Sequence, residues 1–296
     1  LSFAPDDPAR YGRVIRDAGG NVSAIREWKD CTTAERRITE VNSGIYLFKS
    51  KPLFAALPRV GNENRSGEFY LTDVPGLILD GGGRVTAVMA PDADEVRGVN
   101  SLMELAEAAR VLRYRILGDL MSRGVSIIDP ATTFVEAGVK IGKGTIIYPF
   151  SIIMTGVVIG RDCRVGPFSH LRGNAVLAPT AEVGNFVEVK KSHIGPKSKA
   201  KHLAYIGDAT IGKGVNVGAG TITANWDGKD KHPTMIGDSA YIGSNTVFVA
   251  PVKMGRGAKT GAGSIVLSGR DIPDGAIVAG VPARVVKDGK KKGRRR

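Results

Sequence analysis

The chain has 296 residues, of which 42% are hydrophobic, and a formal net charge of +13. This length suits one large domain or two ordinary ones. The sequence shows no run of eighteen apolar residues and no charged-then-apolar leader, so we expect a soluble, cytoplasmic protein without a membrane partner. The two cysteines, Cys31 and Cys163, lie far apart and outside any metal-ligand spacing. We interpret them as ordinary buried thiols, which excludes a disulfide framework and a zinc site.

The positive charge is concentrated at the end of the chain. Residues 287–296 contain seven Lys or Arg against one Asp, which leaves +7 of the +13 for the other 286 residues. No aromatic residue accompanies these charges. We therefore interpret 287–296 as a basic disordered tail without an assigned role, and nucleic acid is not an expected partner.

Residues 1–101 mix short strand-like runs with polar turns. The clearest runs are 42–48 and 85–90, and the mixture is typical of part of an α/β domain. The chain begins at Leu1 inside sequence that already looks folded. We expect 1–101 to be a partial domain.

Residues 102–124 are predicted to form a linker helix. Leu105, Leu112, Ile116 and Leu120 recur at helical spacing, and Gly124 follows them as a C-cap. The helix would connect the partial domain to the repeats that follow.

From residue 125 onward an aliphatic side chain recurs at every sixth position, often followed by Gly. The spacing is unbroken from Val135 to Val189, and shorter runs continue to Val278. A period of six fits a short strand plus a tight corner, repeated three times per coil. We predict a parallel β-helix over 125–286, with about eight coils of 18 residues. The aliphatics would point inward, and the adjacent glycines would allow close approach and positive φ at the corners.

Polar residues that interrupt the repeat cluster between 172 and 231. They include Arg172, Lys190, His202, Tyr205, Asn216 and the insertion 223–233. Acyl transfer from a thioester to an amine needs a base near neutral pKa, a role suited to His, and an N–H donor for the oxyanion, which Ala219-Gly220 could present. From the residues alone, each of the four His is more simply structural. Arg172 and Lys190 fit a phosphate site or a solvated edge equally well.

Residues 172–265 resemble the acetyltransferase half of a bacterial family, the bifunctional N-acetylglucosamine-1-phosphate uridyltransferase/glucosamine-1-phosphate acetyltransferases. The segments LRGNAVL, VGNFVEVKKSHIG, KHLAYIGD and ANWDGKDKHP carry many positions that generic hexapeptide proteins lack. The resemblance implies that the β-helix is left-handed and that acetyl-CoA acetylates the amine of glucosamine-1-phosphate, in UDP-N-acetylglucosamine biosynthesis. It also implies a homotrimer with sites between neighbouring subunits.

The family's residue roles carry over to the matching positions. His202 takes the role of catalytic base, and the sugar phosphate is held by Arg172, Lys190, Tyr205 and Asn216. The acetyl-CoA positions are Ala219, Asn225, Trp226, Ser244 and Ala262. Lys231 lies in the loop that closes over the site, and Glu188 is a candidate to orient His202.

Two positions depart from the family. Trp226 replaces the usual Tyr of the loop, which keeps an aromatic wall but removes a hydroxyl. Gly280 stands where the family often has an Arg for a coenzyme A phosphate. Compensating cations would come from Arg284, Lys259, Arg270 or the basic tail.

The N-terminal part resembles the uridyltransferase domain of the same family from its middle onward, on pieces such as VNSG at 41–44 and GEFYLTD at 67–73. The resemblance implies that Gly12, Glu27, Asn42 and Asn100 contact the UDP-sugar and that Asn100 also touches Mg²⁺. The family's Gly-rich nucleotide loop and the Asp that shares the metal are not in this sequence. We therefore expect uridylyl transfer from UTP to be incomplete in this chain.

Two other interpretations stay open. One is a different hexapeptide acyltransferase, acting on serine, a sugar nucleotide or a lipid precursor, against which the ANWDG loop and the N-terminal part argue. The other is a non-catalytic trimeric β-helix scaffold, which Gly280 suggests. Thermal stabilisation by acetyl-CoA would separate the scaffold from an enzyme, and the identity of the acylated amine would separate the enzymes.

Overall fold

A computed structural model describes residues 1–8 and 10–288. The chain divides into two compact units, Leu1–Val111 and Leu112–Arg296. This boundary falls inside the predicted linker helix, so the limits proposed for the domains at 101 and 124 stay a prediction. Most of the predicted tail, residues 289–296, lies outside the described residues.

The first unit is a small α/β body. Its antiparallel sheet has the strand order β1-β4-β2-β3, with β1 at Ser2–Phe3, β2 at Arg13–Arg16, β3 at Val22–Arg26 and β4 at Val41–Asn42. The helices are α1 (Ser50–Ala56) and α2 (Val74–Asp80). Short 3-10 turns lie at Trp28–Asp30, Glu35–Arg37, Leu57–Arg59, Leu71–Asp73 and Ala93–Glu95. Phe3, Val41 and Val74 are fully buried and form its core.

The two strand-like runs of this unit are mostly not strands, which corrects the sequence prediction. Only Asn42 of 42–48 belongs to a strand, and 85–90 contributes one isolated bridge, from Met89 to Ser2. Leu47 is fully exposed and Val88 is 59% exposed. A strand needs a continuous hydrogen-bonded neighbour, and the few backbone bonds of these runs to Leu1 and Ser2 do not extend into a ladder.

Helix α3 spans Leu102–Ser122 and ends as predicted. Gly124 has φ +86°, its N–H bonds the Met121 carbonyl, and the Val125 N–H bonds the Leu120 carbonyl. This pattern is a Schellman cap. Leu117 and Leu120 are buried in the core of the second unit, so the last turns of α3 cover its first coil. Among the described residues, no helix is long and apolar enough to cross a membrane.

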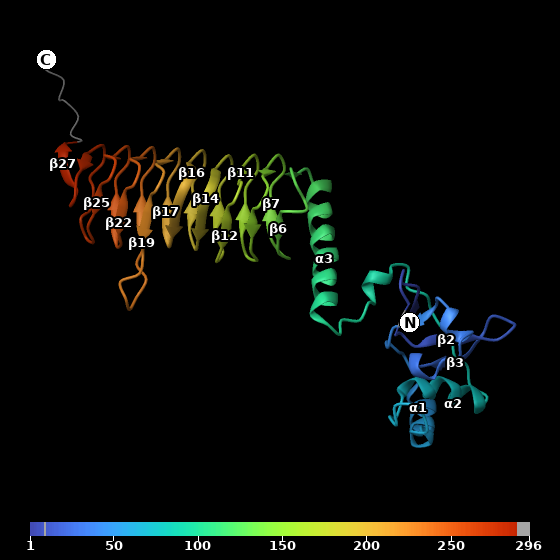
Figure 1. Cartoon of the computed structure of the whole chain (residues 1–296). Coiled ribbons are helices and arrows are strands. Elements are labelled where there is room, and N and C mark those ends of the chain that lie inside the picture. The colour runs from blue at the N-terminus through green and yellow to red at the C-terminus, as the bar shows by residue number, and fades with distance from the viewer. Residues whose placement is uncertain (9, 289–296) are drawn as a thin grey trace, which may run out of the picture. The chain divides into compact units, whose positions relative to one another are not determined.

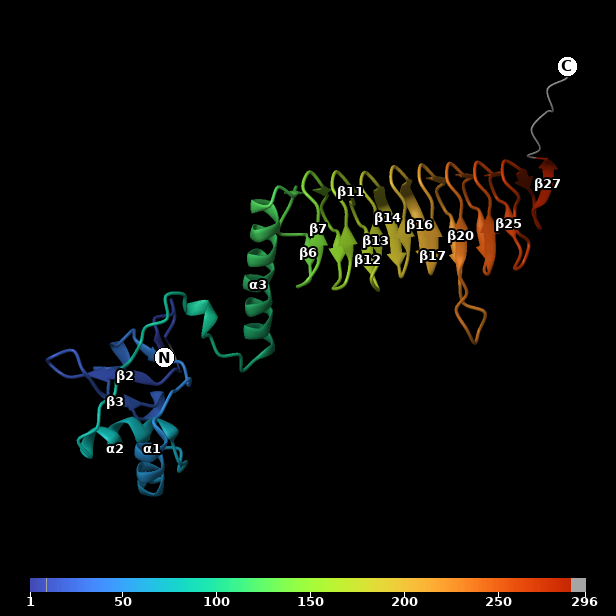
Figure 2. The same cartoon turned by 180° about the vertical axis from the view of Figure 1, so that it is seen from behind.

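The second unit confirms the predicted parallel β-helix, whose stacked coils are seen from two sides in Figures 1 and 2. Face one is a seven-stranded sheet of β7 (Lys140–Ile141), β10 (Val158–Ile159), β13 (Val176–Leu177), β15 (His193–Ile194), β17 (Ala209–Ile211), β20 (Thr234–Ile236) and β23 (Val252–Met254). The coils pair in parallel, each strand with the strand one coil earlier.

Faces two and three are joined into one sheet. Face two holds β5 (Ser126–Ile127), β8 (Ile146–Ile147), β11 (Arg164–Val165), β18 (Asn216–Val217), β21 (Tyr241–Ile242), β24 (Lys259–Thr260), β26 (Ile277–Ala279) and β27 (Arg284–Lys287). Face three holds β6 (Phe134–Val135), β9 (Ile152–Ile153), β12 (His170–Arg172), β19 (Ile222–Ala224), β22 (Val247–Val249) and β25 (Ile265–Val266). Two nine-residue strands, β14 (Glu182–Lys190) and β16 (Lys199–Gly207), run around the corner and belong to both faces.

The predicted inward aliphatics form the core. Ile147, Leu171, Ile206 and Phe248 are all fully buried, and the other positions of the six-residue period are buried with them, except one. That exception, Ile141, is half-buried because β7 is the edge strand of face one. Cys163 is buried in this core and Cys31 in the first unit, both unpaired, which agrees with their interpretation as buried thiols.

The glycines that follow the aliphatics serve both purposes predicted for them, but at different positions. A Cβ on Gly142 would lie 2.5 Å from the Arg161 nitrogen of the next coil, so close approach is confirmed. Positive φ is confirmed at Gly166, which has φ +96°. Gly142 does not have positive φ, which corrects the prediction at that position, and there the left-handed residue comes two positions later, at Gly144.

The far end of the β-helix is closed by a strand that reverses direction. After Gly280 the chain turns back, and β27 pairs antiparallel with β26. Lys287, which was assigned to the disordered tail, is the last residue of this strand. The prediction is therefore wrong for that residue.

Candidate active site

One corner of the β-helix, between faces two and three, stacks five positions that the sequence singled out. Asn245 donates its backbone N–H to the Ala219 carbonyl, and Gly263 donates to that of Ser244, both at 2.7 Å. The same stacking continues in both directions, so that the column reads His202, Ala219, Ser244, Ala262 and Gly280. Coils lie about 4.8 Å apart, and the column is therefore roughly 19 Å long.

His202 is exposed on this corner, in the middle of β16, where the strand passes from face two to face three. Its strand-register neighbour in the preceding coil is Asn185, and the next residue, Leu203, has φ +44° and turns the chain onto face three. Within the described part of the chain, the imidazole has no hydrogen-bond or ion-pair partner. Both ring nitrogens therefore face solvent, which leaves one of them available to accept a proton.

The carboxylate of Glu188 has a different partner from the one suggested by the sequence. Its Oε1 accepts a 2.6 Å hydrogen bond from Nε of Arg172, which lies one coil earlier. The strand register places Glu188 beside Tyr205 on face three, whereas His202 pairs with Asn185 at the corner. Glu188 therefore orients Arg172, and the structure shows no contact with His202.

Three cations converge on face three. Arg172 and Lys190 are register partners in β12 and β14. The ammonium of Lys231 lies against that of Lys190, and this contact lowers the pKa of Lys231 from its ordinary value, with Asp208 and Tyr205 acting in the opposite direction. A cluster of like charges on an open surface is suited to an anionic group with several oxygens, such as a phosphate.

Tyr205 lies at the same place. A Cβ on Gly207 would be 2.5 Å from the phenol oxygen of Tyr205, so the ring extends over Gly207. Gly207 is in turn the register partner of Lys190. The hydroxyl therefore reaches the cation cluster because residue 207 has no side chain.

Asn225 and Trp226 lie at a different corner from Ala219, after face three. Asn225 is buried, and its amide nitrogen donates to the carboxylate of Asp208. Trp226 follows it into the loop between β19 and β20 and is 56% exposed. The predicted acetyl-CoA residues of one chain thus form two groups, separated by the β19 strand of face three.

Asn216 is also apart from the other sugar-phosphate residues. It lies on face two, where it pairs with Lys199 and Tyr241. The structure therefore brings together Arg172, Lys190 and Tyr205 and leaves Asn216 on the other side of the corner.

Gly207 and Asp208 are two residues that the sequence analysis did not single out. Their signal is the sequence YIGD at 205–208, where a Gly and a charged residue end a strand at a corner. The Gly makes room for Tyr205, and the Asp holds Asn225 and faces Lys231.

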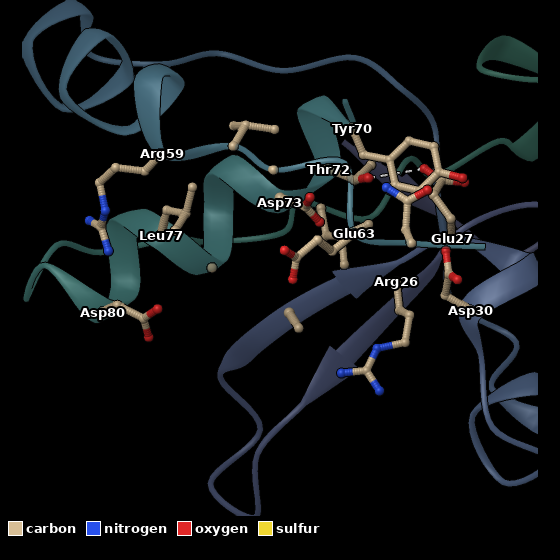
Figure 3. Close-up of a pocket in the computed structure, with 16 residues that line it drawn as sticks. Arg26, Glu27, Asp30, Arg59, Glu63, Tyr70, Thr72, Asp73, Leu77 and Asp80 are labelled. Carbon is tan, nitrogen blue, oxygen red and sulfur yellow. Dashed lines mark hydrogen bonds between the residues drawn. The ribbon is translucent and has the colours of Figure 1, made fainter. Parts of the chain in front are cut away.

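In the first unit, one of the residues predicted to contact a UDP-sugar, Glu27, lines a cleft of about 450 Å³, shown in Figure 3. Glu27 accepts a 3.1 Å hydrogen bond from Thr72. A Cβ on Gly12 would lie 3.5 Å from the Glu27 carboxylate, and the Asn42 N–H donates to the Gly12 carbonyl at 2.8 Å. Gly12, Glu27 and Asn42 are therefore neighbours.

Asn100 is attached to the start of α3 rather than to these three. Its backbone N–H donates to Glu104 at 2.6 Å. Within residues 1–8 and 10–288, no group of three or more His, Cys, Asp or Glu could hold a metal ion. One amide oxygen does not make a magnesium site, so the described residues do not fit the metal implied by the family.

Known proteins resemble this chain in sequence. Residues 138–173 match the bacterial transferase hexapeptide family (six repeats). The chain is 44% identical over 322 aligned positions to the bifunctional protein GlmU of Fervidobacterium nodosum, covering 98% of this chain and 70% of the relative. The GlmU protein of Pelotomaculum thermopropionicum is 46% identical, over 86% of this chain and 63% of the relative.

A likeness among solved structures is weaker. LpxA of Bacteroides fragilis, a UDP-N-acetylglucosamine acyltransferase, aligns with a TM-score of 0.43 and 17% identity, over 53% of this chain and 73% of that one. The identity to the GlmU proteins extends over almost all of this chain and about two thirds of theirs, and on that evidence the chain belongs to the family of the bifunctional protein GlmU.

Proposed function

We propose that this chain is a glucosamine-1-phosphate N-acetyltransferase that uses acetyl-CoA as cosubstrate, in UDP-N-acetylglucosamine biosynthesis. The observation that carries the proposal is the cation cluster of Arg172, Lys190 and Lys231 on face three, with His202 exposed at the corner where that face begins. The cations bind the phosphate, and the exposed imidazole takes the proton of the amine. A cytoplasmic location, expected from the sequence, fits a reaction that consumes acetyl-CoA.

The chemical step follows from these positions. His202 removes a proton from the sugar ammonium and passes it to solvent, and the freed amine attacks the thioester carbonyl carbon. The oxyanion accepts a hydrogen bond from the Ala219 N–H, one coil beyond His202, because the Gly220 N–H is already donated to the Leu203 carbonyl. Collapse of the intermediate breaks the carbon–sulfur bond. The neutral His202 takes the second amine proton and gives it to the departing thiolate of coenzyme A.

The column formed by Ala219, Ser244 and Ala262 is the path we propose for the pantetheine arm. Small side chains along roughly 10 Å of corner suit a long thin ligand. At the end of this path Gly280 supplies no cation, whereas Arg284 is the register partner of Ala279, the residue before it. Arg284 is therefore our candidate for the coenzyme phosphate.

We further propose a homotrimer with its sites between subunits. The support is the division of the acetyl-CoA residues of one chain between two corners, Ala219, Ser244 and Ala262 at one and Asn225 with Trp226 at the other. A site that uses both groups requires one corner from each of two chains. Asn216, on face two, would likewise complete the sugar site across an interface.

Uridylyl transfer is not part of the proposal for this chain. Gly12, Glu27 and Asn42 are neighbours, but the described residues hold no magnesium site. A pyrophosphate-release assay with UTP and N-acetylglucosamine-1-phosphate tests this directly, and release would overturn it.

A non-catalytic scaffold is the second candidate, and the observation that favours it is the missing side chain at Gly280. Acetyl-CoA raises the melting temperature of an enzyme that binds it and leaves that of a scaffold unchanged.

The decisive assay is release of coenzyme A thiol from acetyl-CoA with glucosamine-1-phosphate. His202→Ala should lower kcat by about two to four orders of magnitude, and glucosamine without its phosphate should be a poor acceptor. No release from an intact trimer would favour the scaffold. Release that is faster with serine or a sugar nucleotide would favour another hexapeptide acyltransferase.

A further inference from the structure

The loop between β19 and β20 interrupts the coil and projects from the β-helix, as Figure 1 shows below β19. It leaves face three after Ala224 and returns at Thr234. At its base, the His232 N–H donates to the Asn225 carbonyl at 2.8 Å, and Trp226 bridges Lys231 in antiparallel fashion. The loop is therefore a short closed hairpin and has a defined conformation.

The carboxylate of Asp227 bonds three other residues of this hairpin. Its Oδ1 accepts the backbone N–H groups of Lys229, at 2.8 Å, and Asp230, at 2.6 Å. Its Oδ2 lies 2.7 Å from Nε2 of His232, on the opposite side of the loop. The carboxylate thus ties the tip of the loop to the residue that follows Lys231.

The hairpin holds the positively charged Lys231 near another positive charge, that of Lys190. Asp208, whose N–H bonds the Lys190 carbonyl, also binds Asn225 at the base of the hairpin, so the hairpin begins beside Lys190. The Lys190 ammonium lowers the pKa of Lys231, and the two like charges repel each other until an anion binds between them. Asp208 attracts Lys231, but the same Asp is already bound by Asn225. Something must therefore keep the loop closed while the phosphate site is empty.

We propose that His232 is a positioning residue for the acceptor site: its bond to Asp227 keeps the hairpin closed so that Lys231 stays beside Lys190 and ready for the sugar phosphate. The inference rests on the proposed function. It adds a residue that neither the repeat nor the family resemblance singled out. His232 itself does not touch the substrate in this scheme, because it acts through the position of Lys231.

Holding the cation in place before binding lowers the cost of ordering the loop when substrate arrives. The benefit should therefore appear in KM for the sugar phosphate, with kcat nearly unchanged. His232→Phe keeps an aromatic ring and removes the donor, whereas His232→Gln keeps an N–H near the position of Nε2. His193→Phe is the matched control, because His193 is exposed on β15 of face one, away from the loop.

The experiment measures KM and kcat of the full chain for glucosamine-1-phosphate in these variants. We expect His232→Phe to raise KM about tenfold with kcat within about twofold, and His232→Gln and His193→Phe to stay within about twofold of the unchanged chain. A His232→Phe variant with unchanged KM would overturn the inference. So would an equal rise of KM in the Gln variant, because the donor would then be irrelevant.

A second measurement needs no activity. Trypsin cleaves after Lys229 and Lys231, and mass spectrometry of short digests reports how often the hairpin opens. We expect faster cleavage at these sites in His232→Phe than in His232→Gln or His193→Phe. Equal cleavage in all three would overturn the inference. If the unchanged chain releases no coenzyme A thiol, the proposed function fails, and this digest still decides whether His232 closes the loop.

Discussion

Arg172 and Glu188 form an ion pair across two adjacent coils, with Nε of Arg172 2.6 Å from Oε1 of Glu188. Both side chains are about one third exposed, so the pair contributes little to stability. Its effect is geometric. Because Glu188 holds only Nε, and no other partner is present among the described residues, the two Nη groups of Arg172 are available to an incoming phosphate.

We predict that Arg172→Met lowers kcat/KM for glucosamine-1-phosphate by about ten- to a hundredfold, because it removes a charge-assisted pair of donors. The change for unphosphorylated glucosamine should be several times smaller. Arg164→Met, which changes an exposed arginine of the same coil on face two, is the control and should change neither value. Equal losses for both acceptors would mean that Arg172 does not read the phosphate.

The contact between Lys231 and Lys190 predicts a dependence on pH. The pKa of Lys231 is lowered by the Lys190 ammonium, so Lys231 loses its proton at a lower pH than an ordinary lysine does. As the pH rises, KM for the sugar phosphate should begin to increase when Lys231 becomes neutral. Lys231→Arg keeps its charge throughout, so in this variant the increase should move to higher pH. Identical KM profiles for the two proteins would contradict the assignment.

The same lowered pKa fixes the sign of a stability effect. In the unfolded chain Lys231 binds its proton more tightly than in the folded one, so the free energy of unfolding rises with pH between the folded and the ordinary pKa of this lysine. Lys190→Met removes the repulsion and should abolish that rise. Denaturant titrations of both proteins over this pH range provide the measurement.

Gly207→Ala should damage the site more than the fold. The new Cβ would meet the phenol oxygen of Tyr205 at 2.5 Å, and the ring can swing away without disturbing the backbone. We expect KM for the sugar phosphate to rise by about fivefold to tenfold, with little change in the melting temperature. In a Tyr205→Ala background the substitution should have no further effect. An additive effect in that double variant would show that Gly207 acts without Tyr205.

Substitution of Thr223, in contrast, should lower the stability of the fold. This residue is 1% exposed at a core position of the repeat, and its hydroxyl accepts the Gly207 N–H at 2.7 Å and donates to the Gly207 carbonyl at 3.0 Å. Thr223→Val leaves that buried N–H unpaired and should cost about 1–3 kcal/mol. Thr223→Ser keeps the hydroxyl and should cost less. Calorimetric melting of the two variants is the check, and a Val variant as stable as the Ser variant would disprove the account.

The six-residue spacing predicts the core of the β-helix almost residue by residue, because each inward position must fill the same triangular space. The prediction from this spacing is wrong at single positions where the local environment differs. Ile141 is half-buried because its strand has no neighbour on one side. The strands expected at 42–48 and 85–90 are largely absent, since alternation in a sequence does not supply a pairing partner.

The site depends on the register between successive coils, which decides which residues lie beside one another at a corner. This register is harder to obtain from a sequence. The steps from Val189 to Ile194 and from Ile206 to Ile211 are five residues long, so two coils are one residue shorter than the rest. This shortening places His202 beside Asn185 at the corner. The family resemblance indicated which residues form the site. The structure added that Asn216 and Asn225 lie on different faces or corners from the others.

Strand β27 has a consequence for how the molecule behaves in concentrated solution. A parallel coil that simply stopped would present a free edge ready to receive the first coil of another molecule, and repeated addition would produce filaments. The antiparallel return of Arg284–Lys287 onto β26 occupies that edge on face two with backbone running the wrong way for a further coil. At the opposite end the buried Leu117 and Leu120 of α3 do the same. Addition of a further coil is thereby disfavoured on face two at one end of the β-helix and at the first coil at the other.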